Sequence, residues 1–309
     1  MGIRAVPGLL VLGLCAGIAC GGGSESPSDG PSSGTSADTS PERPSSLGSP
    51  IALVGDGGDT VRLHEPPGRI VSLVPSATET LIRLGVAERL VGRTDYDTAP
   101  ALSDLPSVGG GLQPNLEILR TLDPDVVVAF AGDSDAVTAR TLGTLGIPVL
   151  RVRPDGIPDV RRMVLRLGEL VQEEGPARTL VAEIDGTLEE IRAAVAPFPR
   201  VRAVYLLGGT PPLAAGPGSF LSQLVEVGGG ENVLDDLGAL YAPVSPEVLL
   251  ERDVDAVLMT RGSRVDARIL EGRRVVELPG EVEIPGPDVG ASAWIVARAL
   301  HPELPVRDR

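Results

Sequence analysis

Few residues of this chain are of a type that could carry out catalysis, and the sequence shows no second group that would activate them. The sequence contains no G-x-S-x-G, P-loop or H-E-x-x-H motif. Its only histidines are His64, ahead of the first core strand, and His301, in the tail, which excludes a histidine-rich metal site. Ser76 follows a predicted strand, but no base accompanies it, and a capping box with Glu79 explains it better than a nucleophile. The sequence therefore predicts no catalytic residue and no enzyme.

Two carboxylates, Glu117 and Glu247, occupy equivalent places in two copies of one pattern. Pro114–Phe130 reads PNLEILRTLDPDVVVAF, and Ser245–Met259 reads SPEVLLERDVDAVLM, with the matching Glu, Asp and Val residues 130 positions apart. Each copy predicts a capped helix with the glutamate in its first turn, followed by a buried strand. The alternatives are two ordinary units with chance matches, or a two-lobed protein with one carboxylate at the same place on each lobe.

Bulk properties narrow the class of protein. The 309 residues suffice for two domains, and a formal net charge of −15 argues against nucleic acid as a partner. Aromatic residues make up only 2%. Both cysteines, Cys15 and Cys20, lie in the first twenty residues, so the folded part has no disulfide and no cysteine-ligated metal.

The N-terminus has the pattern of a lipoprotein signal. Arg4 precedes an apolar run, Val6–Ile18, which is too short to span a bilayer as a mature helix. Gly17–Cys20 resembles the bacterial lipobox, which predicts a signal peptide at residues 1–19 and lipidation of Cys20. The alternative is an ordinary signal peptide with an incidental cysteine. Residues 20–50, rich in Gly, Ser and Pro, are expected to form a disordered tether.

Two α/β halves flank a helical segment. Residues 51–154 contain a hairpin around Gly55–Gly58 and then alternating strands and helices, which predicts an N-terminal lobe. Residues 155–199 carry helical apolar periodicity with a break near Gly175-Pro176, and residues 200–309 resume the alternation, with a turn at Gly228–Asn232. The predicted fold is α/β: two Rossmann-like lobes of mostly parallel sheet, joined by one long rigid helix, with a ligand cleft between them.

Five segments together resemble one known family. They are RIVSLVPSATETLIRLGV (69–86), VGRTDYDTAP (91–100), VGGGLQPNLEILRTLDPDVVVAF (108–130), TLGIPVL (144–150) and LVEVGGGENVL (224–234). Their order and content resemble the cobalamin-type substrate-binding proteins of ABC importers, the class III binding proteins with a helical backbone. The resemblance covers about Arg69 to Leu300.

The resemblance implies a receptor that works with an ABC permease and its ATPase. In that family each lobe docks on permease arginines through a surface glutamate, which matches Glu117 and Glu247 here; the alternative is that both are simple first-turn helix charges. The implied protein is a monomer outside the cytoplasm. A lipid anchor would be its only link to a membrane, on the periplasmic side or on the outer face of the cytoplasmic membrane.

The family holds its ligand between the lobes, on loops at strand ends. Of the matching positions, Tyr96 is the best single candidate because its TDY loop follows the family closely, whereas Trp294 also suits a core position. The positions implied are Pro75, Ser76, Asp95, Tyr96, Gly111 and Leu112 in the first lobe, and Thr210, Pro211, Tyr241, Arg261 and Trp294 in the second, with Tyr241 in a loop.

The ligand implied is a corrinoid, carried as cargo without any prosthetic group. The chain departs from its relatives at Gly110-Gly111-Leu112, where a tryptophan is common, and at Leu213-Ala214, where a phenylalanine can stand. A ferric siderophore or haem is therefore the alternative cargo, and a tyrosine would have to ligate the haem. An envelope enzyme and a sensor or scaffold without transport are the alternatives from other classes.

Overall fold

The computed structural model describes residues 50–133 and 135–305. The predicted signal peptide, Cys20 and all of the predicted tether except Pro50 lie outside the described residues. The described residues all belong to one compact unit. Within the described part, no helix combines the length and apolar character needed to cross a membrane.

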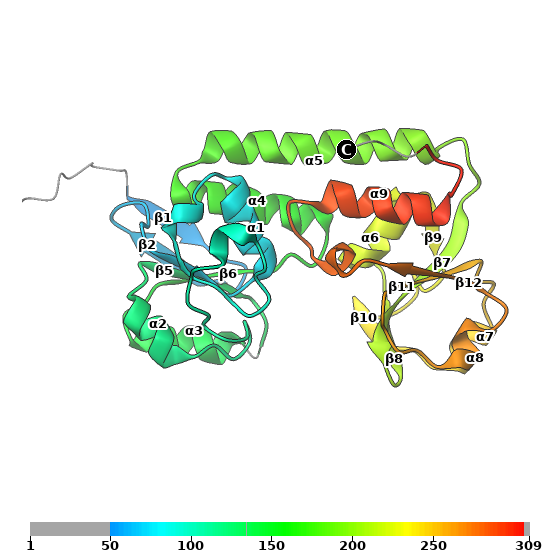
Figure 1. Ribbon diagram of the computed structural model, residues 1–309, viewed down its shortest axis with the longest axis horizontal. Helices are drawn as coiled ribbons and strands as arrows, with labels where there is room; N and C mark the ends of the chain where they lie inside the picture. Colours follow the sequence, from blue (N-terminus) through cyan, green and yellow to red (C-terminus); the bar gives the residue numbers. More distant parts are fainter. Residues whose placement is uncertain (1–49, 134, 306–309) are drawn as a thin grey trace, which may run out of the picture. The chain divides into compact units, whose positions relative to one another are not determined.

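The first lobe is built on a parallel sheet (Figure 1). Its strand order is β4-β3-β5-β6. Every residue from Val126 to Ala129 is buried, as expected for a continuous apolar strand covered on both faces. The elements are β3 (Ile70–Ser72), α1 (Pro75–Arg83), β4 (Leu90–Gly92), α2 (Leu116–Leu122), β5 (Val126–Phe130), α3 (Asp135–Thr144) and β6 (Val149–Val152), preceded by the predicted hairpin of β1 (Ile51–Val54) and β2 (Thr60–Leu63).

The second lobe repeats this strand order with an antiparallel extension. Its parallel strands lie in the order β9-β7-β11-β12. Antiparallel to them, β8 pairs with the later part of β7, and β10 pairs with β8. Both lobes therefore place the first, third and fourth parallel strands of the lobe side by side. The elements are β7 (Val201–Gly209), β8 (Pro212–Ala215), α6 (Phe220–Val227), β9 (Gly230–Asn232), β10 (Tyr241–Pro243), α7 (Pro246–Leu250), β11 (Ala256–Thr260), α8 (Ala267–Leu270), β12 (Arg274–Leu278), the 3-10 turn η3 (Gly280–Glu283) and α9 (Val289–Leu300).

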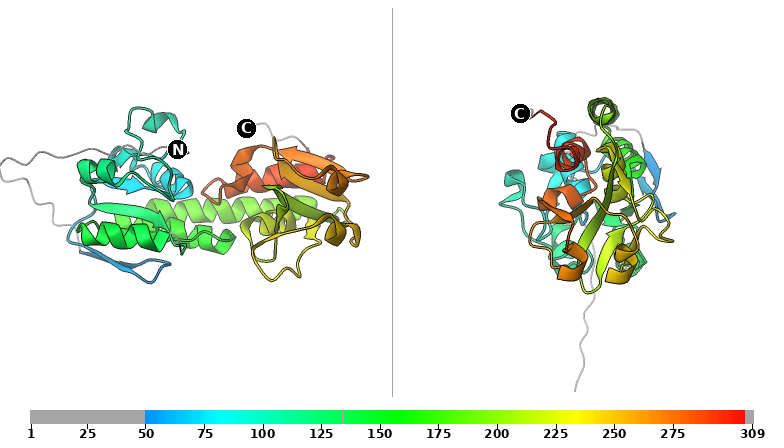
Figure 2. Two further views of the ribbon diagram at one scale, coloured as in Figure 1. Left: turned by 90° about the horizontal axis from the view of Figure 1, so that it is seen from below. Right: turned by 90° about the vertical axis from the view of Figure 1, so that its right-hand side faces the viewer.

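Two helices link the lobes, α4 (Ile157–Val171) and α5 (Glu174–Val195). The chain breaks between them at Gln172, whose φ is 59°, so the predicted break at Gly175-Pro176 was placed too late. Pro176 lies in the first turn of α5, where a missing N–H costs no helix bond. Helix α5 packs on α4 and on α9 of the second lobe, and Figure 2 shows it running along both.

One apolar core runs through both lobes. It contains Ile70 and Leu81 from the first lobe, Leu167 and Leu188 from the linking helices, and Phe220 from the second lobe, all nearly inaccessible to water. Two smaller clusters fill the opposite faces of the two sheets. The linking helices are thus part of the core of each lobe.

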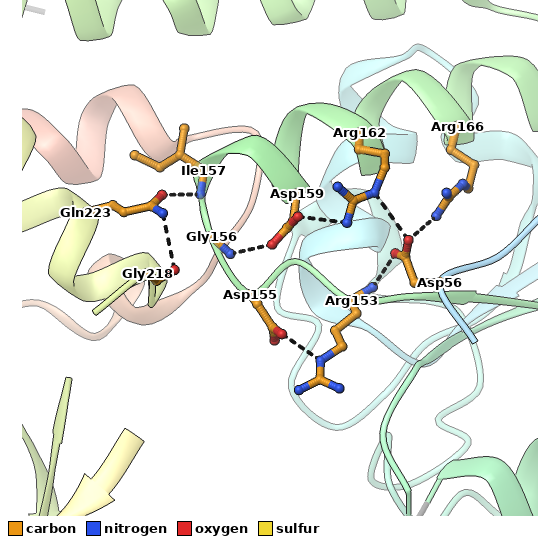
Figure 3. Close-up of polar contacts among 10 residues, drawn as sticks. All are labelled: Asp56, Arg153, Asp155, Gly156, Ile157, Asp159, Arg162, Arg166, Gly218 and Gln223. Atoms are coloured by element: carbon orange, nitrogen blue, oxygen red, sulfur yellow. Dashed lines mark hydrogen bonds and ion pairs between the residues drawn. The ribbon is translucent and has the colours of Figure 1, made fainter. Parts of the chain in front are cut away.

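The crossing from β6 into α4 is fixed from both lobes (Figure 3). In the second lobe, Gln223 accepts a hydrogen bond at 2.7 Å from the main-chain N–H of Ile157, in the first turn of α4. On the other side, Asp56 of the hairpin accepts bonds from the main chain of Arg153 and from the guanidinium of Arg166, at 2.8 and 2.7 Å. These bonds hold the linker between the two sheets.

The predicted capping box of Ser76 and Glu79 is wrong. Helix α1 begins at Pro75, its N-cap is Val74, and no side chain caps it. Proline fits the first helical position because it lacks an N–H that would otherwise need a partner. Ser76 is therefore inside the helix, and its hydroxyl lies 3.9 Å from the sulfur of Met163.

Candidate functional site

A pocket opens at the carboxyl ends of the two central strands of the first lobe. Strands β3 and β5 pair with each other, and the chain continues from β3 to β4 on one side of this pair and from β5 to β6 on the other, which makes this a switch point of the sheet. Such switch points are where open parallel sheets bind ligands. The pocket has a volume of about 580 Å³ and is lined by Leu73, Val74, Pro75, Tyr96, Gly110, Gly111, Leu112, Gln113 and Phe130.

The glycine run of the pocket is required by close packing. A Cβ atom on Gly111 would lie 2.2 Å from the carbonyl oxygen of Leu73, so no larger residue fits without moving the backbone. Gly109 has a φ of 85°, in the region that favours glycine. The run lets the loop lie directly over the end of β3. It also places Gly110 beside the ring of Tyr96: a Cβ atom added to Gly110 would lie 3.9 Å from the Cε2 atom of that ring.

A tight turn after β4 presents Tyr96. The buried carboxylate of Asp97 accepts hydrogen bonds from the main-chain N–H and the hydroxyl of Thr94, at 2.7 and 2.8 Å. Asp95 accepts a bond from the hydroxyl of Ser107 at 2.5 Å, and its own N–H donates to the carbonyl of Gly109. The turn is thus fixed internally and to the glycine run, while the Tyr96 side chain is left 70% exposed.

The pocket suits a largely apolar ligand. No lining side chain carries a charge, and Leu112 in the lining is 61% exposed. Exposed tyrosine and leucine side chains beside a pocket gain free energy when a ligand covers them. A larger hollow of about 780 Å³ at the end of α5 has arginine and carboxylate side chains in its lining and contains none of the predicted ligand residues.

The predicted ligand residues of the first lobe fall into two groups. Pro75, Tyr96, Gly111 and Leu112 line the pocket. Ser76 is buried under it, and Asp95 lies in the turn that carries Tyr96. Phe130, at the end of β5, also lines the pocket and was not among the predicted residues. Its position as the last residue of the apolar strand in the repeated pattern could have indicated a place in the ligand site.

The predicted residues of the second lobe lie outside this pocket. Thr210 and Pro211, joined by a cis peptide bond, form the exposed tip between β7 and β8. Tyr241 begins β10 opposite Ala215, so its predicted place in a loop was wrong; burial is the largest cause of its raised pKa. The remaining two are Arg261, exposed directly after β11, and Trp294, half-buried in α9 against the main core.

Sequence reasoning missed a polar group at the switch point of the second lobe. Tyr205 of β7 is buried, and its hydroxyl lies 3.2 Å from that of Thr260 at the end of β11. It also donates to the carboxylate of Glu283 at 3.3 Å, and the Thr260 hydroxyl donates to the same carboxylate. Burial is the largest cause of the raised pKa of Tyr205. Because these residues lie 23 or more positions apart, only the fold unites them.

Glu117 and Glu247 lie in the first turns of two equivalent helices. Glu117 is exposed on α2, where Asn115 caps the helix by accepting from the N–H groups of Glu117 and Ile118. Glu247 is exposed on α7, and a hydrogen bond from the Ser245 side chain is the largest cause of its lowered pKa. Neither carboxylate forms an ion pair with a described residue.

Metal-binding geometry is absent from the described residues. No three of their His, Cys, Asp or Glu side chains come together in a way that could hold a metal ion. The pocket lining offers mainly apolar surface to a ligand, and the side chains of Tyr96 and Gln113 are its polar groups.

Known proteins with this sequence pattern and fold are binding proteins. The family model described as periplasmic binding protein matches residues 70–279. A protein of Halobacterium salinarum, named cobalamin-binding protein, is 32% identical over 216 residues, which span 67% of this chain and 58% of that relative. The periplasmic vitamin B12-binding protein of Vibrio cholerae has the same fold, with a TM-score of 0.66 at 22% identity over 76% of this chain and 97% of that one.

A solved protein that is named for a different ligand matches the fold of this chain equally well. The apo form of a periplasmic heme-binding protein from Roseiflexus sp. RS-1 gives a TM-score of 0.66 at 20% identity, over 76% of this chain and 98% of that one. The two-lobed fold is therefore shared by proteins of different ligand names. With the family model matching most of the chain, this protein belongs to the periplasmic binding protein family, a family of substrate-binding transport components.

Proposed function

We propose that this protein is the extracytoplasmic receptor of an ABC importer and that it captures a corrinoid between its two lobes. The observation that carries the proposal is the uncharged pocket of about 580 Å³ at the switch point of the first lobe, with Tyr96 and Leu112 open at its rim. A corrin ring is a broad, flat ligand that can lie on such a surface, and ligand pockets commonly combine apolar walls with few polar groups. The name of the Halobacterium relative supports the same cargo.

The receptor would be held at the membrane by a lipid on Cys20 and would dock on its permease through Glu117 and Glu247. Both carboxylates are exposed and lack ionic partners among the described residues, which leaves them available to arginines of another protein. Residues 51–154 and 200–309 would act as the two lobes on either side of the linking segment. The Cys20 anchor is checked by metabolic labelling with a radioactive fatty acid, which Cys20→Ser should abolish.

Calorimetric titration of the full-length protein tests the cargo. Cyanocobalamin, cobinamide, haem and several ferric siderophores are titrated separately, and the corrinoids are expected to bind most tightly. Tyr96→Ala removes the exposed ring and should weaken corrinoid binding about 10- to 100-fold, the usual range for an aromatic contact that dominates binding. The matched control is Leu145→Ala, an exposed apolar residue directly after α3 that does not line the pocket.

Haem is the alternative cargo, with the Tyr96 hydroxyl as the iron ligand. An iron–tyrosinate absorption band in the wild type that Tyr96→Phe removes would favour haem. If no corrinoid produces heat and a siderophore binds tightly, the corrinoid proposal is wrong. Turnover of any titrated compound would favour the envelope-enzyme class instead.

A further inference from the structure

The two lobes touch directly where α1 meets the loop that leads into α9. A Cβ atom added to Gly286 of that loop would lie 3.1 Å from Glu79 Oε2 and 3.3 Å from the Cβ atom of Ser76. Gly286 is buried, and Pro75 at the start of the same helix lines the pocket. The loop of the second lobe therefore rests on a helix of the first lobe, beside the proposed ligand site.

An ion pair extends this contact. Arg83 Nη1 lies 2.6 Å from Asp288 Oδ1, which belongs to the N-cap residue of α9. Arg83 Nη2 also lies 3.6 Å from Glu183 Oε2 on α5. All three side chains are exposed, so each pair contributes little free energy and is screened by salt. The ion pairs alone would not hold the lobes together.

Glu79 occupies the centre of the contact. It is half-buried, and its pKa is raised to about 7 by burial first and then by repulsion from Asp288 and Asp97. The other charged groups facing this contact are Arg83 on the same helix and Glu183 on α5. From α4, the neighbour of α1 is the uncharged Met163, next to Ser76. Glu79 thus has two carboxylates as neighbours and one arginine, which is already engaged by others.

We propose that Glu79 is a proton-operated latch between the two lobes. With Glu79 neutral, the loop 284–288 rests on α1 and the lobes stay together. With Glu79 ionised, its carboxylate repels Asp288 and requires water, which loosens the contact.

The direction of the effect follows from linkage between proton binding and lobe closure. Separating the lobes exposes Glu79 and moves it away from Asp288, so the open form binds the proton more weakly than the closed form. Raising the pH through the titration of the closed form therefore shifts the population toward the open form. For the receptor proposed above, and resting on that function, ligand release would be faster in alkaline surroundings than in acidic ones.

Distance measurements between the lobes test the latch without any ligand. The full-length chain carries Cys15→Ser and Cys20→Ser, with spin labels at Val137→Cys on α3 and Leu250→Cys on α7, positions that are 57% and 63% exposed. Pulsed electron paramagnetic resonance then gives the distance distribution between pH 5.5 and 8.5. The population at the short distance is expected to fall as the pH rises toward the closed-form pKa of Glu79, about 7, and to level off above it.

Two variants and a control separate the latch from a general effect of pH. Glu79→Gln keeps this position neutral, and its distance distribution should no longer depend on pH. Asp288→Asn removes one repelling charge, and the midpoint should move to lower pH. The control is Glu88→Gln, an exposed glutamate of the same lobe, which should behave as the wild type.

The latch is overturned if the wild-type distance does not change with pH, or if Glu79→Gln responds as the wild type does. Should Glu79→Gln fail to fold, the shift in Asp288→Asn decides the matter, and an unshifted midpoint would overturn the proposal. The calorimetric titrations decide the proposed cargo separately, because the distance measurement needs no ligand.

Discussion

The helix–strand unit of the first lobe, α2 with β5, and that of the second, α7 with β11, share one backbone arrangement but are held by different side chains. In both, an aspartate precedes the strand, and its N–H donates at 2.8 Å to the carbonyl of an arginine where the neighbouring strand begins. Asp125 donates to Arg69, directly before β3, and Asp255 donates to Arg202, the second residue of β7. The carboxylates then accept from main-chain N–H groups across the same junction. The two units therefore have equivalent ends.

The two arginines differ in what they bind. The guanidinium of Arg69 donates to the main-chain carbonyls of Leu122 and Asp123, at the end of α2. That of Arg202 donates to the carboxylates of Asp253 and Asp255. The positive charge of the arginine is thus compensated by main-chain carbonyl groups in the first lobe and by carboxylates in the second. A repeated backbone can keep its geometry while its electrostatics change.

The largest expected effect tests whether the two units act together on a partner. Glu117→Arg combined with Glu247→Arg should lower ligand uptake in cells about 100-fold or more, because placing like charges opposite permease arginines costs several kcal/mol. Ligand affinity, measured by calorimetry, should stay within about twofold, since neither residue lines the pocket.

The control for docking is Glu88→Arg with Glu271→Arg, one exposed glutamate from each lobe, which should leave uptake unchanged. If uptake survives the charge reversals at Glu117 and Glu247, the docking role is wrong, and the two residues act only as favourable charges in the first turn of their helices. Each single reversal shows whether the two lobes contribute equally.

A smaller effect distinguishes the two aspartates. Asp125→Ala leaves the N–H groups of Gly68 and Arg69 without their carboxylate partner and should lower the free energy of unfolding by about 1–2 kcal/mol. Asp255→Ala should cost less, about 0.5–1 kcal/mol, because its exposed ion pair with Arg202 is partly replaced by water.

Urea unfolding at 0.05 and 0.5 M salt measures both aspartate variants. Only the cost of Asp255→Ala should shrink in high salt, because screening weakens an exposed ion pair and leaves bonds to the main chain largely unaffected. Asp104→Ala, an exposed aspartate, is the reference. Equal salt dependence in the two lobes would contradict the difference drawn above.

The helix caps should also differ between the lobes. Asn115→Ala removes a side chain that accepts from two N–H groups of α2 and should cost about 1 kcal/mol of unfolding free energy. Ser245 makes no capping bond to the main chain, so Ser245→Ala should cost only a few tenths. Thermal unfolding followed by circular dichroism compares them, and a larger loss for Ser245→Ala would refute the assignment.

The smallest expected effect is a dependence of the unfolding free energy on pH, caused by Asp255 in the second lobe. The hydrogen bond from Arg202 is the largest cause of the lowered pKa of Asp255. A carboxylate with a lowered pKa in the folded state stabilises it above its unfolded pKa of about 3.9, and this contribution is lost as the pH falls through the folded value. Asp255→Asn should therefore unfold more easily than the wild type at pH 6 and by a smaller margin at pH 3.

The repeated elements were predictable because their signals are local. Asn115, the apolar run Val126–Phe130 and the spacing of Pro246 each predict structure within a few residues, and the structure confirms the helix and strand in both lobes. The resemblance added the two-lobed fold, which is confirmed. Four of the predicted first-lobe ligand residues line one pocket.

Elements held by distant partners were not predictable in the same way. The sequence predicts a turn at Gly228–Asn232, but Gly230–Asn232 form strand β9, because they pair with β7 despite their low β-propensity. Tyr241 belongs to a strand only because β8 lies beside it. The group of Tyr205, Thr260 and Glu283 depends on contacts across the second lobe. The pKa of Glu79 is raised first by burial and then by two carboxylates distant in sequence, Asp288 of the other lobe and Asp97 of its own.

The core that passes from one sheet through α4 and α5 into the other has a consequence for unfolding. Residues of both lobes belong to one continuous apolar cluster, so neither lobe can lose its packing without exposing the helices that the other lobe also needs. A two-lobed protein with separate cores would melt in two steps. Here the two lobes share helices, so unfolding of one lobe destabilises the folded state of the other. Calorimetry should therefore record a single cooperative unfolding transition.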